Sequence, residues 1–519
     1  MRKYGAKLAK IILFRADFRF FFRTFNKKIN ICCNFAREKY FQTLPAARAT
    51  HWQVASGVEG VFNSEINMKQ TERANFGSRL GIILATAGSA VGLGNVWRFP
   101  TMAGEHGGAA FILVYIFCVL LLGVPCMLNE FIIGRRAQAN TARAYSKLAG
   151  GTPWRFIGYF GVFTGFIISG YYCVVSGWCL QYVYASIVGE LDGDPAFVQQ
   201  YFADFSSNPW KPIVWLVVFF LITHFVIVRG VEKGIERASK VMMPLLFILL
   251  VVIAVAACLL PNAGRGISFL FSPDFSKVDS SVLLGALGQA FYSLSLGMGC
   301  LCTYASYFSR QTHLTKSALQ IVSIDTVIAI LAGLMIFPAV FSVGGDVGAG
   351  PSLVFITLPN VFNQAFSAMP FVGHIIALMF YLLLSVAALT SLISLHEVST
   401  AFFHEEMNIS RSSAATIVTV ACSIIGVFCS LSFYNTDLSL FGMQLFDLFD
   451  FVSGQIFLPL GGFLTCLFMG WYVKKQILYD ELTNQGTLSG RLFGVYLFCV
   501  RFVCPLCILL IFLNQFGII

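Results

Sequence analysis

The chain has 519 residues, of which 57% are hydrophobic and only 12% are charged. This composition excludes an ordinary water-soluble domain and predicts a polytopic α-helical membrane protein, since apolar runs of about 18 or more residues recur along it. The formal net charge of +10 lies mainly in residues 1–67, with twelve Lys and Arg against four Asp and Glu, so it does not indicate a nucleic-acid partner.

Residues 1–67 differ from the rest and are expected to form a basic extension without a fold that the membrane core needs. They lack the layout of a cleavable signal peptide. Three interpretations are open: translation upstream of a natural start at Met68, a basic amphipathic arm on the anionic inner leaflet, or a targeting extension. The stretch from Met68 to Arg73 resembles a natural N-terminus and favours the first.

Eleven apolar runs are long enough to cross a bilayer. Their approximate bounds are 80–103, 108–133, 156–189, 210–228, 239–260, 282–308, 317–343, 372–402, 413–432, 442–473 and 491–515. Lys and Arg gather in the loops after the second, fourth, sixth and tenth runs, whereas loops 190–209 and 344–371 contain neither. The positive-inside rule then predicts a multi-pass protein of the cell (inner) membrane, with its N-terminus in the cytoplasm and its C-terminus outside.

The first run contains a stretch that suits a helix poorly, from Gly88 to Pro100 (GSAVGLGNVWRFP). Each glycine costs a helix about 1 kcal/mol relative to alanine. An ionisable residue such as Arg98 at membrane depth indicates a functional site. Because non-helical backbone is tolerated there only inside protein or along a water-filled cavity, the stretch predicts a broken helix with a polar site at the break.

The sixth run repeats this anomaly between Gln289 and Gly299 (QAFYSLSLGMG). Glycines can also simply permit close helix packing, but paired interruptions in corresponding halves indicate a midplane binding site between inverted repeats. We therefore expect five-helix repeats at 68–279 and 280–475, followed by an eleventh helix within 476–519. Free N–H groups at half-helix starts suit an anion and free carbonyls at half-helix ends suit a cation, so an amino acid zwitterion with sodium would use both.

These motifs resemble the neurotransmitter:sodium symporter family, most closely its bacterial sodium-dependent amino acid transporters. The similarity runs from about Arg73 to the last span. Further matching signatures are Glu130 with Gly134-Arg135, Tyr171-Tyr172 with Trp178, Thr303 to Tyr307, Phe355 to Pro359, and Ala387 to Ser391. The resemblance implies the leucine-transporter fold, with broken helices 1 and 6, and a carrier that works by alternating access.

The resemblance implies two sodium sites. The first would use the Ala90 carbonyl, Asn95, Ser293, Asp325 and the substrate carboxylate. The second would use the carbonyls of Gly88, Val91 and Ala387 with the hydroxyls of Thr390 and Ser391. Hard oxygen ligands of this kind suit a hard cation.

Asp325 departs from the family's animal members, which usually have asparagine there and bind chloride nearby. An uncompensated carboxylate in the membrane costs several kcal/mol, so Asp325 must face cations. Ala329 offers no hydroxyl for chloride. We expect no chloride requirement, and Asp325 could also carry a proton on the return step.

Amine-transporting relatives place an aspartate where this chain has Gly92, so the substrate is expected to bring its own carboxylate. The family's substrate positions correspond here to Ala90, Gly92, Leu93, Gly94, Ile168, Tyr172, Tyr292, Ser293, Ser295, Met298, Ser394 and Leu395. They include no acidic or basic side chain. A neutral, hydrophobic or aromatic L-amino acid is therefore expected, with the flexible Met298 favouring larger side chains.

Gate residues also follow from the resemblance. Arg98 and Asp450 would approach each other above the substrate, over a lid formed by Tyr172 and Tyr292. On the cytoplasmic side Arg73 would pair with Glu405, and Phe76 would plug the inner path; the alternative role of Arg73 is a positive-inside anchor.

Several alternatives were weighed against this interpretation. The scattered histidines and cysteines show no metal-ligand spacing, and no nucleophile motif indicates an enzyme. A sodium-dependent amine or osmolyte symporter and a non-transporting sensor of the same fold remain open. The interpretation requires a lipid bilayer but no oligomer.

Overall fold

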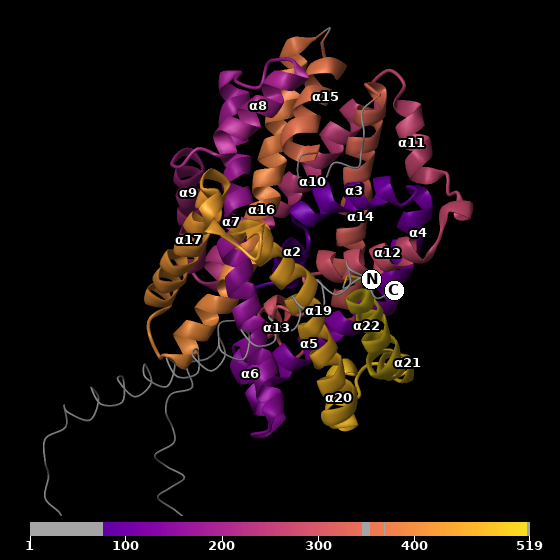
Figure 1. Cartoon of the computed structure of the whole chain (residues 1–519). Coiled ribbons are helices and arrows are strands. Elements are labelled where there is room, and N and C mark those ends of the chain that lie inside the picture. Colours follow the sequence, from indigo (N-terminus) through magenta and orange to yellow (C-terminus); the bar gives the residue numbers. More distant parts are fainter. Residues whose placement is uncertain (1–75, 345–352, 368, 516–519) are drawn as a thin grey trace, which may run out of the picture. The chain divides into compact units, whose positions relative to one another are not determined.

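The computed structural model describes residues 76–344, 353–367 and 369–515 (Figure 1). The chain separates into two units, Met1–Thr71 and Glu72–Ile519, and the described residues all belong to the second. The expectation for residues 1–67 therefore lies outside the described residues and stays a prediction.

Nine helical segments of the described chain are long and apolar enough to cross a membrane. They are Ala109–Ala137 (α4, Ala109–Cys118, and α5, Val124–Ala137), Pro153–Val188 (containing α7, Phe156–Val188), Lys211–Val228 (α9), Val231–Cys258 (ending in α10, Arg237–Cys258), Leu314–Ser342 (α14), Pro370–Glu406 (α16), Arg411–Tyr434 (α17), Leu445–Tyr472 (α18, Leu445–Asp450, and α19, Leu458–Leu467) and Phe493–Gln515 (α21, Phe493–Phe498, and α22, Cys504–Gln515). These segments confirm the predicted all-helical membrane fold.

Two further spans are interrupted. Helix α2 (Arg79–Ala90) and the segment Gly94–Glu105 form a tenth span, bent by 56° at the break. Helices α12 (Ser280–Ser293) and α13 (Cys300–Ala305) form the other broken span, with residues 294–299 between them. Both predicted interruptions are therefore present, and the described spans agree with the expected number of about eleven.

The fifth span begins earlier than the hydropathy predicts, at Val231 instead of about residue 239. Its polar first turns are stabilised by Glu236, which is only 2% exposed. This carboxylate accepts hydrogen bonds from Gly77 N (2.6 Å) and Ser78 Oγ (2.7 Å) and lies 2.7 Å from Lys240 Nζ. A buried charge that is paired and hydrogen-bonded is tolerated, so the helix extends through residues that look like a loop.

Short elements connect the spans. They are α6 (Thr141–Ala149), α8 (Pro195–Ser206), α11 (Ala263–Phe271), α15 (Leu358–Ala365), α20 (Lys475–Leu482) and a hairpin of β1 (Ser439–Leu440) with β2 (Met443–Gln444). Phe441 (φ 58°) and Gly442 (φ 77°) form the hairpin turn, which needs a positive φ at both positions.

The spans pack in two groups that surround the breaks. Helices α7, α9, α16 and α17 contact one another, whereas α14 contacts α2, α5 and α10 (Figure 1). Helix α2 also contacts α16, so the first break lies between the two groups. At the second break, a Cβ on Gly297 (φ 85°) would lie 2.3 Å from the carbonyl oxygen of Leu458, so only glycine allows the approach of α19.

Candidate functional site

The first break is short, and its free amides meet side chains. Helix α2 ends at Ala90, and the chain resumes helical form at Gly94 as a π-helical turn (Gly94–Arg98) that leads into α3 (Phe99–Glu105). Gly92 N donates to Asn95 Oδ1 (3.0 Å), and Leu93 N donates to the Tyr172 hydroxyl (3.4 Å). These N–H groups form the start of a half-helix, where an anion is favoured.

The second break is held open by left-handed residues and by one carboxylate. Ser295 (φ 53°), Gly297 and Gly299 (φ 78°) all have positive φ. Glu130 of α5 accepts hydrogen bonds from Gly297 N (2.7 Å) and Cys302 N (3.2 Å). Because a carboxylate here replaces the missing helical acceptors, Glu130 stabilises the interruption.

A cavity of about 50 Å³ lies between the two breaks. Ser295 Oγ donates to the Ser89 carbonyl (2.9 Å), and this bond joins the two broken helices directly. All twelve residues expected to contact substrate line the cavity, together with Ser89, Tyr171, Ser391 and Leu458. The structure thus brings together residues from 90 to 395 in the sequence, and their roles in binding stay predictions.

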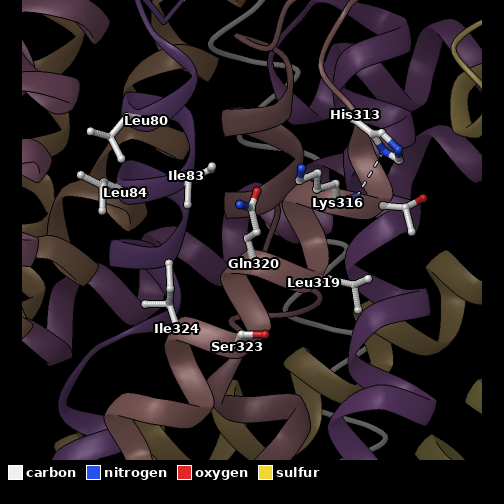
Figure 2. Close-up of a pocket in the computed structure, with 10 residues that line it drawn as sticks. Leu80, Ile83, Leu84, His313, Lys316, Leu319, Gln320, Ser323 and Ile324 are labelled. Carbon is white, nitrogen blue, oxygen red and sulfur yellow. Dashed lines mark hydrogen bonds between the residues drawn. The ribbon is translucent and has the colours of Figure 1, made fainter. Parts of the chain in front are cut away.

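A wider pocket of about 710 Å³ lies elsewhere, between α2 and α14 (Figure 2). Aliphatic side chains of α2 face a mixture of polar and aliphatic ones at the start of α14, and Leu80 and Leu319 are exposed there. It contains no backbone group of either break. The smaller cavity is therefore the better candidate site, since convergent polar groups in an enclosed space are what a ligand site requires.

Asp325 is the centre of a buried polar cluster beside the cavity. Its Oδ1 accepts hydrogen bonds from Asn95 Nδ2 (2.7 Å) and Ser293 Oγ (3.1 Å), and its Oδ2 accepts one from the Tyr115 hydroxyl (3.1 Å). All four side chains are buried. Three of the residues expected at the first sodium site thus lie together, and the oxygen atoms of Asn95, Ser293 and Asp325 are the hard ligands that a sodium ion would need. Ala90, the fourth, lines the neighbouring cavity.

Two residues of this region had no role predicted from the sequence. Tyr115 lies in α4 and donates to Asp325; a hydroxyl in the middle of an apolar run was the available signal. Gln289 lies four residues before Ser293 on α12, hence on the same helix face. Both its amide atoms are buried without a hydrogen-bond partner in the described part of the chain, which is typical of a group that meets water or an ion.

The expected residues of the second sodium site also converge. Thr390 Oγ1 lies 3.3 Å from the Val91 carbonyl oxygen and 2.9 Å from that of Ala387, and Ser391 Oγ lies 3.4 Å from the Val91 oxygen. A Cβ on Gly88 would lie 3.3 Å from Thr390 Cβ, so α2 and α16 are close there. These are neutral oxygen atoms from the end of α2 and from the middle of α16.

A side chain at Gly92 would require the Ser391 hydroxyl to move. A Cβ there would lie 2.4 Å from Ser391 Oγ and 3.3 Å from the Tyr172 hydroxyl oxygen. Distances below 3.0 Å force a displacement. An acidic side chain at this position would therefore disturb the groups that form the second sodium cluster.

Two groups of side chains correspond to the gates that are expected at the two ends of the cavity. At one end the Arg98 guanidinium carbon lies 4.1 Å above the centre of the Tyr292 ring. Asp450 is exposed, and within the described residues it forms no direct ion pair with Arg98. The closed form of this gate stays a prediction.

The other end is tightly packed. Phe76 is 8% exposed, and its ring centre lies 6.0 Å from those of Tyr304 and Tyr307. Arg73 lies outside the described residues, so its pairing with Glu405 stays a prediction. Glu405 Oε2 accepts hydrogen bonds from the backbone and side-chain nitrogens of Asn140 (2.9 and 3.0 Å).

A family model described as the sodium:neurotransmitter symporter family matches residues 73–195 and 198–518. The chain belongs to this family. It is 37% identical to an uncharacterized sodium-dependent transporter of Bacillus subtilis, YhdH, over 87% of this chain and 100% of the relative. It is 34% identical to a sodium-dependent transporter of Haemophilus influenzae over 86% of this chain and 98% of that protein.

Among solved structures, the crystal structure of MhsT in complex with L-phenylalanine is similar, with a TM-score of 0.77. The identity is 43%, and the match covers 85% of this chain and 100% of that one. These findings confirm the predicted family and the leucine-transporter fold. A member of the symporter family is a sodium-dependent membrane transporter and not an enzyme.

Proposed function

We propose that this symporter moves a neutral, apolar or aromatic L-amino acid together with sodium ions and without chloride. The observation that carries the proposal is the convergence of both helix breaks, two oxygen-rich clusters and an uncharged side-chain pocket on one cavity. A zwitterion needs donors for its carboxylate and acceptors for its ammonium group. The ends of half-helices supply both, so no buried charged side chain is needed to pair with either group of the substrate.

The choice of an amino acid over an amine is supported by Gly92. An aspartate at this position would meet a substrate ammonium in an amine carrier, but its Cβ alone would overlap Ser391 Oγ. The substrate must then provide the carboxylate. It would lie near the amides of Leu93 and Gly94, next to the first sodium ion and the Tyr172 hydroxyl.

An apolar substrate side chain is supported by the far wall of the cavity. Ile168, Met298 and Leu395 line it, and no lining side chain carries a charge. The space of about 50 Å³ is small for an aromatic ring, so the substrate would displace side chains, for which the unbranched Met298 is suited. MhsT, solved with L-phenylalanine, supports the aromatic end of this range.

We propose that both oxygen clusters bind sodium. At the first, the ion would replace hydrogen bonds that Asn95 and Ser293 now donate to Asp325. At the second, neutral ligands would keep affinity moderate, so that the ion can leave. Two positive charges crossing 100 mV would supply roughly 4.6 kcal/mol to substrate accumulation.

Chloride independence is supported by the permanent carboxylate of Asp325 and by the apolar Ala329 one helical turn beyond it, which is fully buried. The carboxylate can neutralise a sodium ion where other members use a bound anion. Proton uptake by Asp325 on the return step is a further possible consequence of this charge.

Access to the site would alternate between the two ends. Arg98 and Asp450 would close the outer end, above the Tyr172 and Tyr292 rings, and Phe76 would close the inner end. The protein would lie in a cell membrane with its N-terminus inside and its C-terminus outside. Reporter fusions at both termini test this orientation, and no oligomer is required.

The test is sodium-driven counterflow in proteoliposomes combined with competition for sodium-dependent phenylalanine binding. We expect phenylalanine, tryptophan, tyrosine, leucine and methionine to compete, and charged amino acids, amines and betaines to fail. Competition by an amine or an osmolyte would favour that class of substrate instead. Binding of substrate without counterflow would identify a sensor. Loss of uptake when gluconate replaces chloride in the buffer would refute chloride independence.

A further inference from the structure

Three cysteines that are far apart in the sequence meet inside the membrane domain. Cys126 of α5, Cys466 of α19 and Cys504 of α22 are all buried, and their Sγ atoms lie within 4.8 Å of one another. Cys126 Sγ lies 3.6 Å from Cys466 Sγ. No spacing in the sequence indicates this cluster, because each thiol comes from a different span.

The spacing of the sulfur atoms fits a metal ion. Thiolates bind zinc at about 2.3 Å, so sulfurs around one ion lie roughly 3.8–4.0 Å apart in tetrahedral or trigonal geometry. One separation is 3.6 Å and all of them lie within 4.8 Å, so small side-chain movements would bring the three sulfurs into that range. Three sulfur ligands in an apolar surrounding select soft cations over sodium or magnesium.

A neighbouring amide is fixed so that it favours negative charge on one sulfur. The Tyr496 hydroxyl donates to Asn129 Oδ1 (2.6 Å), which leaves the amide nitrogen to donate to Cys466 Sγ (3.6 Å). Partners of this kind orient metal ligands and tune their basicity. Glu130, four residues after Cys126 on the same helix face, adds a carboxylate near the sulfurs.

We propose that Cys126, Cys466 and Cys504 form a site for a soft divalent cation of the zinc and cadmium class, and that occupation of this site slows transport. Thiolates are the form that binds such an ion, so the three thiols release their protons to solvent as it binds, and the Asn129 amide donor faces the negative charge on Cys466. A groove of about 760 Å³ is lined in part by Tyr496 and by Leu121, whose carbonyl lies 3.9 Å from Cys504 Sγ, and an ion would approach from there.

The effect on transport follows from what the three helices hold. Glu130 of α5 accepts the Gly297 amide at the second break. On α19, a Cβ at Gly461 would lie 2.4 Å from the Gly297 carbonyl oxygen, so this helix also lies directly against the break. An ion that ties α5 to α19 would therefore restrict movement at the broken span, where alternating access requires it.

The binding test uses the reduced, purified full chain in detergent. Cadmium titration should produce the ultraviolet sulfur-to-cadmium charge-transfer band with one ion per chain at saturation. Cys466→Ser should weaken binding by roughly 100-fold or more, and Asn129→Leu by about 10–100-fold. The matched control is Cys429→Ser, which changes a buried cysteine of α17 outside the cluster.

Melting temperatures of the metal-free variants show whether each one is folded. If Cys466→Ser is unstable, Cys126→Ser and Cys504→Ser test the same site from the other helices. Equal cadmium affinity in the wild type and in all folded cluster variants would overturn the site.

The transport test uses the same variants in proteoliposomes. Cadmium should inhibit sodium-driven uptake by the wild type and by Cys429→Ser, and a chelator should reverse the inhibition. Cys466→Ser should transport equally with and without cadmium. Stoichiometric cadmium binding with unchanged wild-type uptake would overturn the link to transport while leaving the proposed substrate and sodium coupling intact.

Discussion

Replacing Asp325 by asparagine should remove the negative charge that compensates sodium, with almost no change in size. The carboxylate now accepts three buried hydrogen bonds, from Asn95, Ser293 and Tyr115. An asparagine keeps one oxygen acceptor but turns an amide nitrogen toward some of these donors. A chloride ion could restore the charge only if a hydroxyl is also supplied, as in the double variant Asp325→Asn/Ala329→Ser.

The expected magnitude follows from the geometry of this cluster. The hydrogen-bond lengths of 2.7–3.1 Å place the other ligands near Asp325, so a bound sodium ion would lie within roughly 4 Å of its carboxylate. Unit charges at that distance interact by about 4 kcal/mol at an effective dielectric constant of about 20. We therefore expect sodium affinity to fall by about 10²–10³-fold in chloride-free buffer.

The assay is sodium-dependent binding of radiolabelled phenylalanine, measured across sodium concentrations in gluconate and in chloride. The single variant should show the reduced affinity in both buffers, and the double variant should recover in chloride alone. Asp447→Asn, which changes an exposed aspartate of α18, is the control. A single variant whose sodium dependence in gluconate stays within about threefold of the wild type would refute the role of the charge.

Three further outcomes follow from the same geometry. Gly92→Ala should weaken sodium-dependent binding by roughly 10–100-fold, since overpacking against Ser391 costs about 1–3 kcal/mol. Glu130→Gln should lower both the melting temperature and maximal uptake, because a hydrogen bond between a charged group and Gly297 is worth about 1.5–3 kcal/mol. Burial and neighbouring basic charges hold the pKa of His313 below its ordinary value. The free energy of unfolding should therefore fall as pH drops through about 6.5. The fall should be smaller in His313→Asn, because asparagine can still cap the helix.

Each of these predictions has a control and a contradicting result. Gly288→Ala, where a Cβ meets nothing within 4 Å, should bind normally, and equal loss in both alanine variants would contradict the role of Gly92. Glu105→Gln changes an exposed carboxyl and should melt like the wild type. Melting curves of the wild type and His313→Asn with the same pH dependence would contradict the histidine prediction.

Much of the fold could be predicted because its signals are local. Hydropathy over about 20 residues marks a span wherever it occurs. Gly92 and Gly297 mark the breaks because glycine lowers the stability of a helix at its own position, whatever packs against that helix. The cavity residues, from Ala90 to Leu395, were identified by motif resemblance, and the structure brings them to one place.

What the sequence determined by itself is therefore the number of spans, the two interruptions and the types of residue at the breaks. The tertiary structure decided which distant side chains meet. Tyr115 donates to Asp325, Gly77 donates to Glu236 of the fifth span, and Arg501 donates to the carbonyl of Gly470 (2.6 Å). The meeting of Cys126, Cys466 and Cys504 has the same origin, since no local pattern specifies how spans hundreds of residues apart pack against one another.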